Sequence, residues 1–234
     1  MPQPELPLEV LEERPDLLVL DKPAGWHAHP LREGELGTLA NALVARYPEC
    51  KHASEDPREG GLCHRLDRET SGAIVAARSR TTYLAVRDAL RTNNVEKIYL
   101  GLVRGEPPEV GDCELPITGR GVRPKIWRSP RDGARRTAIT AFRTIGRAGG
   151  FALLEVRIAT GARYQIRVHL SALGFPLAGD ALYHGGEPAP GLERHLLHAF
   201  KVGLPAPWSL RVVAPLPTDA ERALRQLGFV QSLT

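Results

Sequence analysis

The residues best suited to chemistry are concentrated in one short segment, His64-Arg65-Leu66-Asp67-Arg68-Glu69-Thr70-Ser71-Gly72. Asp67 stands between two arginines, and neighbouring guanidinium groups favour the ionised form of a carboxyl group. An ionised carboxylate at neutral pH can act as a nucleophile or as a base. An arbitrary Arg-x-Asp-Arg segment is more often a surface ion-pair cluster. Other parts of the chain must therefore decide between the two interpretations.

A second segment, residues 119–136, is strongly basic and contains Asp132 as its one acidic residue. Trp127 lies in its middle, and basic residues interleaved with an aromatic ring suit an RNA backbone with an exposed base. The alternative is a solvated, mobile hairpin. We interpret the segment as an RNA-binding arm. Its basic residues are Arg120, Arg123, Lys125, Arg128, Arg131, Arg135 and Arg136.

The elements that must position these segments follow from hydrophobic patterning. A continuous apolar run predicts a buried strand over 72–77, directly after Asp67. A strand pair flanks a turn at 14–16, and further strands are expected over 98–103 and 151–158. Helices are predicted over 37–47, 81–92, 164–173 and 219–227. Gly174 is the expected C′ glycine of the third helix, and Thr218 with Glu221 forms a predicted capping box for the fourth. Because strands and helices alternate irregularly, we expect an α+β fold with a mixed or antiparallel sheet.

Composition sets broader limits. The 234 residues carry a formal charge of +4, and 42% are hydrophobic, which fits one globular domain with an ordinary core. We expect a loose Pro-rich segment over 1–8 and a single domain over 9–234. Three cysteines without a CxxC pair favour a reducing cytoplasm over a disulfide framework. The N-terminus predicts no signal peptide, and no apolar stretch approaches a membrane span.

Six motifs, in order along the chain, resemble the RluA-type RNA pseudouridine synthases. The segment around Asp67 matches the family pattern H-R-L-D-x-x-T-S-G at each specified position. The resemblance spans about residues 10–216. The other five motifs are 18–25, with its K-P-A-G loop; 96–100, the K-x-Y strand; 165–170, the Q-I-R-V-H helix; 174–180, similar to G-x-P-[IL]-x-G-D; and 196–199, the L-L-H-A strand.

The resemblance implies a fold and a set of roles. It implies a mixed, mostly antiparallel central sheet with flanking helices and a central active-site cleft. Asp67 aligns with the catalytic aspartate, Tyr99 with the tyrosine that lies against the target base, and Arg167 with the arginine that pairs with the catalytic carboxylate. Arg65 aligns with the arginine that fills the space left by the flipped nucleotide. Arg68 is a further candidate RNA contact.

One motif departs from the family pattern T-G-R-[TS]-H-Q-[IL]-R. Here residues 160–167 read Thr-Gly-Ala-Arg-Tyr-Gln-Ile-Arg, so the arginine moves to Arg163 and the histidine is replaced by Tyr164. We expect Arg163 to reach the same phosphate from another angle. The first motif has Asp21 where asparagine is common.

The resulting hypothesis is a stand-alone catalytic domain that isomerises uridine in ribosomal or transfer RNA. It requires no cofactor, because no redox or group-transfer step occurs. Its expected partner is structured RNA, not DNA or a membrane, and a monomer is the default. Two alternatives remain: a non-catalytic RNA-binding module on the same fold, and a metal-dependent hydrolase built on Asp67, Asp180 and histidines. We expect no metal site, because the histidine and cysteine spacings match no zinc pattern.

Overall fold

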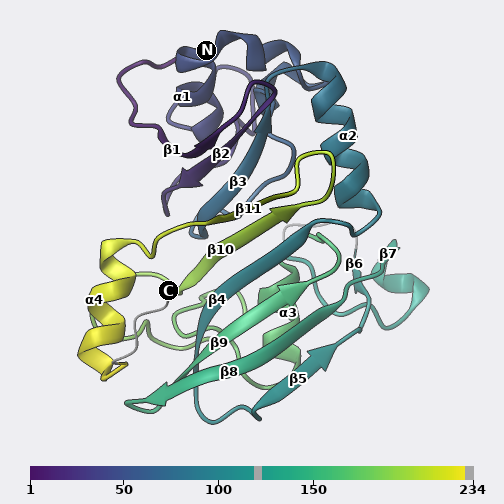
Figure 1. The fold of residues 1–234 in the computed structure, drawn as a ribbon. Helices are drawn as coiled ribbons and strands as arrows, with labels where there is room; N and C mark the ends of the chain where they lie inside the picture. Colours follow the sequence, from purple (N-terminus) through teal and green to yellow (C-terminus); the bar gives the residue numbers. More distant parts are fainter. Residues whose placement is uncertain (119–122, 230–234) are drawn as a thin grey trace. The chain divides into compact units, whose positions relative to one another are not determined.

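A computed structural model describes residues 1–118 and 123–229 of the chain. The chain divides into two compact units, each built from more than one stretch of sequence. The first contains Met1–Glu96 and Ala199–Pro215, and the second contains Lys97–His198 and Leu216–Thr234. Helices and antiparallel strand pairs are intermixed in both units (Figure 1), which confirms the predicted α+β class.

The sheet of the first unit has the order β1-β2-β3-β10, with β11 paired to β10. The predicted strand pair and the predicted buried strand are confirmed by the pairing of β1 with β2 and of β2 with β3. The elements are β1 (Glu9–Glu13), β2 (Leu17–Lys22), α1 (Leu39–Arg46), η1 (Pro48–His52), η2 (Pro57–Glu59), β3 (Ser71–Ala77), α2 (Arg80–Arg91), β10 (Leu197–Leu204, of which the first two residues belong to the second unit) and β11 (Leu210–Val213).

β2 and β3 are apolar on both faces because both faces are buried. Val19 and Val75 belong to a core cluster that also contains Val86 of α2. The alternate residues Leu18 and Ile74 point to the opposite face and are fully buried there too. Continuous apolar sequence therefore produces two adjacent buried strands in the middle of this sheet, and β3 directly follows the Asp67 segment.

The N-terminal residues contact α1. The backbone N–H of Gln3 donates to the carbonyl of Asn41, and the Asn41 side chain donates to the carbonyl of Met1. The same asparagine completes a capping box with Thr38 at the start of α1. One side chain thus satisfies both the helix N-terminus and the segment in front of it.

The sheet of the second unit has the order β4-β9-β8-β5, and a separate pair joins β6 to β7. α3 packs against β8 on one face of this sheet (Figure 1). The elements are β4 (Glu96–Arg104, whose first residue belongs to the first unit), β5 (Val110–Cys113), β6 (Ile117–Thr118), η3 (Pro130–Asp132), β7 (Arg135–Arg136), β8 (Thr140–Ala148), β9 (Phe151–Ile158), α3 (Gln165–Ala172) and α4 (Thr218–Leu227).

The C-terminus of α3 and the N-terminus of α4 are the two helix ends for which the sequence predicts a capping residue. Gly174 follows the C-cap of α3 and has a φ of 87°, as expected for a C′ glycine. The predicted Thr218 capping box is wrong. Pro217 is the N-cap, and no side chain caps α4. Because the Pro217 carbonyl accepts the Glu221 N–H, Thr218 is already helical and its hydroxyl does not serve as the cap.

Over residues 1–118 and 123–229, no helix combines the length and the apolar character needed to cross a bilayer.

Candidate active site

Asp67 lies in a loop that is attached to β3 by several hydrogen bonds. The Cys63 N–H donates to the Val75 carbonyl (2.9 Å), and the Val75 N–H donates to Nε2 of His64 (3.0 Å). His64 therefore replaces a strand partner and accepts through a neutral ring nitrogen. Asp67 itself is half-buried, and its carbonyl accepts the Thr70 N–H at 3.1 Å. The loop around the predicted catalytic carboxylate thus has a defined turn conformation.

A buried lysine connects this loop to the K-P-A-G loop. The Nζ atom of Lys22 donates to the carbonyl oxygens of Pro23 (2.7 Å), Trp26 (2.8 Å) and Arg68 (3.1 Å). The Lys22 side chain is fully buried. Buried ammonium groups require such partners, because an unpaired charge in the interior is very costly. Lys22 therefore ties the residue after Asp67 to the loop that follows β2.

Arg68 strengthens the same connection. Its Nε donates to the Gly25 carbonyl (2.9 Å), while the Gly25 N–H donates to the Arg68 carbonyl (2.8 Å). The Arg68 side chain, a predicted RNA contact, thus also has a structural partner. Arg65, two residues before Asp67, is exposed.

Asp21, the departure from the first motif, lies beside Lys22 on β2. Burial and the nearby charge of Glu9 raise the pKa of Asp21 to about 6. The ionised form of Asp21 is therefore less stable in the folded protein than in water. A neutral amide of the same shape would avoid this cost.

Tyr99 lies on β4 in the second unit, opposite Val156 of β9, and is largely buried. Lys97 precedes it by two residues and so lies on the same face of the strand. Lys97 Nζ donates to the Thr160 carbonyl at 3.1 Å, and burial lowers the pKa of this lysine to about 8. The K-x-Y strand thus supports the 160–163 loop with its lysine and presents the tyrosine beside it.

Arg167 is held by a buried two-point ion pair with Asp180. Nε donates to Oδ2 at 2.6 Å and Nη2 donates to Oδ1 at 2.7 Å. Burial alone would raise the pKa of Asp180, but the hydrogen bonds and charge of Arg167 outweigh it and lower that pKa below 3.8. The pair uses two of the three guanidinium nitrogens, so it fixes the plane of the group.

Two aromatic rings flank the same guanidinium. The Arg167 Cζ lies 4.5 Å from the centre of the Tyr164 ring and 5.3 Å from that of Tyr183. Tyr164 has a φ of 58°, an uncommon backbone conformation for a residue other than glycine. Tyr183 is buried and Tyr164 is partly exposed, and cation–π contacts on both rings help to position the arginine. Tyr164, which stands where the family pattern has histidine, therefore contacts Arg167.

His195 is a third neighbour of this pair. Burial, followed by the charge of Arg167, lowers the pKa of His195 to about 4, so the ring is neutral at pH 7. Its Nε2 is buried and has no hydrogen-bond partner among the described residues. The ring thus adds no positive charge beside Arg167.

The remaining motif residues build the scaffold of α3. The Gln165 side chain donates to the Ile139 carbonyl (2.9 Å) and accepts from Thr160 Oγ1 (2.8 Å). His169 lies within hydrogen-bond distance of Thr140 Oγ1 and of the Leu115 carbonyl. These contacts fasten the helix to β8 and to the chain before β6, and they hold Arg167 on a rigid element.

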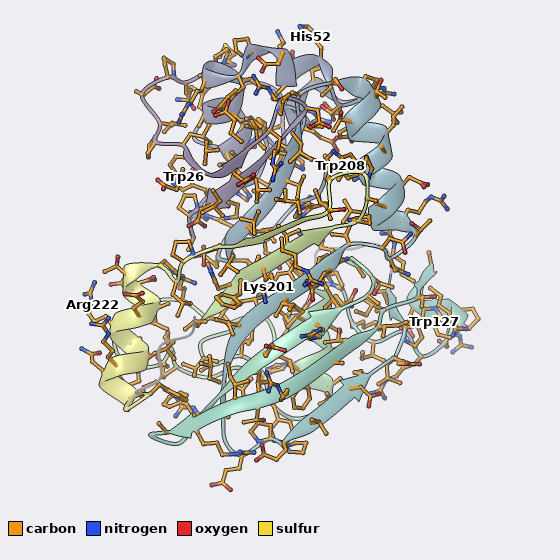
Figure 2. All side chains as sticks on the ribbon, viewed as in Figure 1. Trp26, His52, Trp127, Lys201, Trp208 and Arg222 are labelled. Carbon is orange, nitrogen blue, oxygen red and sulfur yellow. The ribbon has the colours of Figure 1, made fainter. Side chains whose placement is uncertain are left out.

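The described part of the predicted RNA-binding arm, residues 123–136, makes several contacts within itself. Trp127 lies at the outer end of the second unit beside η3 and β7 (Figure 2), and its ring N–H donates to the Gly133 carbonyl. Arg135 lies over this ring, 5.4 Å from its centre. Arg123, Lys125 and Arg128 are exposed. Arg120, also predicted to bind RNA, lies outside the described residues.

The predicted site residues fall into both units. Asp67, Arg65 and Arg68 belong to the first, and Tyr99, Arg167, Arg163 and the described arm belong to the second. The pairing of Asp67 with Arg167 would join the two units and stays a prediction. Arg163 donates to the Tyr164 hydroxyl at 3.0 Å.

Sequence reasoning did not anticipate two of these roles. The sequence presents Asp180 as the last residue of the 174–180 motif and as a possible metal ligand, and its position 13 residues from Arg167 gives no signal that the two side chains pair. Lys22 belongs to the K-P-A-G loop of the 18–25 motif, and the sequence does not show that its side chain is fully buried. In the described part of the chain, no cluster of three or more His, Cys, Asp or Glu side chains could hold a metal ion.

Known proteins resemble this chain over most of its length. The family described as RNA pseudouridylate synthase matches residues 16–172. An uncharacterised RNA pseudouridine synthase of Chloroflexus aurantiacus is 41% identical over 88% of this chain and 65% of its own length. A ribosomal large subunit pseudouridine synthase D of Xanthomonas campestris is 36% identical over 95% of this chain and 70% of its own. The chain thus spans about two thirds of these relatives.

Solved structures agree with the sequence comparison. Human RNA pseudouridylate synthase domain containing 4 superposes with a TM-score of 0.74 and 27% identity, covering 94% of this chain and 92% of that one. Human RNA pseudouridylate synthase domain containing 1 gives a TM-score of 0.72 and 26% identity, over 97% and 91%. Both agree with the fold that the six motifs implied. On these grounds, the chain belongs to the RNA pseudouridylate synthase family.

Proposed function

We propose that this protein converts uridine to pseudouridine within structured RNA, with Asp67 as its essential carboxylate. The observation that carries the proposal is the complete H-R-L-D-x-x-T-S-G segment in a chain that belongs to this family. The hydrogen bonds of His64 and Lys22 support it, because they hold the Asp67 loop in one conformation. A preorganised carboxylate loses little freedom when the substrate arrives.

The reaction exchanges one bond to the ribose for another. The C1′–N1 bond breaks, uracil rotates, a C1′–C5 bond forms, the proton on C5 leaves and N1 gains a proton. Asp67 could attack the sugar, attack the base or remove a proton from C2′, and all three routes need an ionised carboxylate. The target nucleotide must leave its stack before C1′ and C5 can both reach one group.

Tyr99 and Arg167 have proposed roles in this scheme. Tyr99 offers an aromatic face to the uracil ring and a hydroxyl for removal of the C5 proton. Arg167 would keep Asp67 ionised and oriented through a charge-assisted hydrogen bond. Its support is the fixed plane that Asp180 and the two tyrosine rings give the guanidinium.

The proposed substrate is ribosomal or transfer RNA, bound by a monomer in the cytoplasm. Relatives named ribosomal large subunit pseudouridine synthase D favour ribosomal RNA. Three buried free cysteines fit a reducing compartment. Arg65, Arg68, Arg163 and the arm would contact phosphates, as their charge suits. Pseudouridine mapping of total RNA from a deletion strain would identify the target.

Activity in the presence of EDTA separates the three candidate functions. The proposed isomerase forms pseudouridine with EDTA present and loses that activity in Asp67→Asn. A metal-dependent hydrolase would cleave RNA and stop on chelation. A non-catalytic RNA-binding module would bind RNA and leave every uridine unchanged, which would refute the proposal.

A further inference from the structure

Residues 123–128 of the arm and one side of α3 line an open pocket that the proposed catalytic groups do not use. Its volume is about 540 Å³, and it lies entirely in the second unit. Ile126 of the arm and Val168 and Ala172 of α3 provide apolar lining. Val168 and Ile126 also pack in one hydrophobic cluster with Tyr183. The pocket therefore has an apolar floor supported by a small core of its own.

The rim of this pocket is cationic. Arg123, Lys125 and Arg128 line it from the arm. Asp132 holds part of the rim in place: it pairs with Lys125 Nζ at 2.6 Å and accepts the Arg128 N–H at 2.9 Å. Asp132 pairs with one of the three cationic side chains, so the rim keeps a positive excess that suits an anion.

His184 forms the wall beside Arg123. An arginine can only donate, so the 3.0 Å contact from Arg123 Nη2 requires His184 Nε2 to accept. His184 has a φ of 63°. The next residue must be glycine, because a Cβ on Gly185 would lie 1.9 Å from the Leu177 carbonyl oxygen. The chain thus turns sharply here, at some conformational cost, and the turn places a polar ring at the pocket mouth.

One aromatic ring connects the pocket to Arg167. The Cζ atoms of Arg123 and Arg167 each lie 5.3 Å from the centre of the Tyr183 ring. The Tyr183 hydroxyl donates to the Pro124 carbonyl at 2.7 Å, which fixes the arm on this ring. A ligand in the pocket would therefore lie close to the guanidinium that we assign to the proposed active site.

We propose that this pocket binds one unpaired nucleotide of the RNA, near the uridine that is modified. This inference rests on the proposed function for the identity of the ligand as RNA. The base would lie on the apolar floor formed by Ile126, Val168 and Ala172. Its phosphate would meet Arg123 and Arg128 at the rim. An apolar surface for a base combined with cations for a phosphate is how proteins bind single-stranded RNA.

A bulky residue at Ala172 tests the pocket without changing its charge. Ala172 is exposed in the last turn of α3, and Ala85 is exposed on α2. Ala172→Trp would fill the pocket, and Ala85→Trp is the matched control. The probes are a fluorescein-labelled short oligouridylate and an abasic ribose-phosphate oligomer of equal length and charge. Fluorescence anisotropy gives the Kd of each.

We expect Ala172→Trp to weaken oligouridylate binding by about tenfold, the scale of one base contact, and to leave the abasic oligomer unaffected. Ala85→Trp should alter neither Kd. Equal Kd values for wild type and Ala172→Trp on oligouridylate would overturn the proposal. So would an equal loss on both probes, because it would indicate a site for phosphates alone or a damaged fold.

Two further variants address the rim. Arg123→Gln should weaken both probes more than Arg222→Gln, which removes an exposed arginine of α4 (Figure 2). Equal losses in these two variants would contradict the assigned rim. The outcomes also separate this inference from the proposed function. If the wild type forms no pseudouridine but Ala172→Trp still weakens base binding, the pocket proposal stands and the proposed function fails. If Ala172→Trp is active and its KM for RNA is unchanged, the pocket proposal fails and the proposed function stands.

Discussion

Arg167 and Asp180 form a two-point ion pair that is almost fully removed from solvent, with N–O distances of 2.6 and 2.7 Å. Asp180 also accepts the backbone N–H groups of Leu182 and Tyr183. The arginine that the family motif assigns to catalysis is therefore held by a residue of a different motif. The guanidinium plane is set before any substrate binds.

Asp180→Asn should be strongly destabilising. Removing one partner of a buried pair leaves the other charge uncompensated, at a cost of roughly 3–5 kcal/mol. Chemical denaturation at pH 7 measures the loss. Because the pKa of Asp180 is lowered in the folded protein, its contribution is present above pH 4 and is lost as pH falls below the usual carboxyl range. Asp219→Asn, at the half-exposed pair with Arg194, is the control and should cost far less.

Lys22→Met should impair both stability and turnover. The methionine fills similar space but leaves the carbonyls of Pro23 and Trp26 without the ammonium donor, and each unsatisfied buried group costs about 1–3 kcal/mol. The Asp67 loop would also lose one of its three hydrogen bonds at Arg68, the one from Lys22, and would keep the two with Gly25. Thermal unfolding and single-turnover pseudouridine formation measure the two effects. Lys51→Met, at an exposed lysine of η1, should change neither; normal turnover in Lys22→Met would contradict the positioning role.

Asp21→Asn should stabilise the protein at neutral pH. The folded-state pKa of about 6 lies above the ordinary value of 3.8, so the native state loses stability as pH rises through that interval. The amide removes this penalty, by an amount on the order of 1 kcal/mol after solvent screening is considered. We expect a Tm higher by about 2–4 °C at pH 7.5 and no gain at pH 3. A lower Tm at pH 7.5 would show that the carboxylate is favourable there.

Replacing Arg128, Arg131, Arg135 and Arg136 by glutamine should weaken RNA binding and flatten its salt dependence. Each lost phosphate contact on single-stranded RNA reduces the slope of log Kd against log salt by about 0.7. Titrations at several salt concentrations provide the slope. Four exposed arginines elsewhere, Arg91, Arg211, Arg222 and Arg225, form the matched control set. Identical slopes in the two sets would remove the arm from the RNA interface.

The parts of the fold that depend on local patterning were predictable. The apolar runs of β2 and β3 and the C′ glycine of α3 occur where expected. β5 was missed because Val110–Cys113 is short and half polar, so its strand character comes from pairing with β8. The capping box of α4 failed because Pro217 supplies the N-cap instead.

In the candidate site too, local sequence features were predictable and long-range contacts were not. Motif matching identified the residues of the proposed chemistry, because those types recur at fixed spacings within short segments. It could not assign partners that meet only in the folded chain, such as Asp180 for Arg167 or the carbonyl of Arg68 for Lys22. Pairing of this kind depends on long-range packing, and long-range packing produces no periodic pattern of residues in the sequence.

Pseudouridine formation by Asp67→Asn is the most direct test of the proposed function. The amide keeps the size of the side chain but can neither act as a nucleophile nor accept a proton as a carboxylate does. With an RNA that the wild type modifies, we expect no pseudouridine from the variant and a Kd within about threefold of wild type, since a neutral isostere at a partly exposed position changes binding little. Turnover by Asp67→Asn at a rate near that of the wild type would contradict the account.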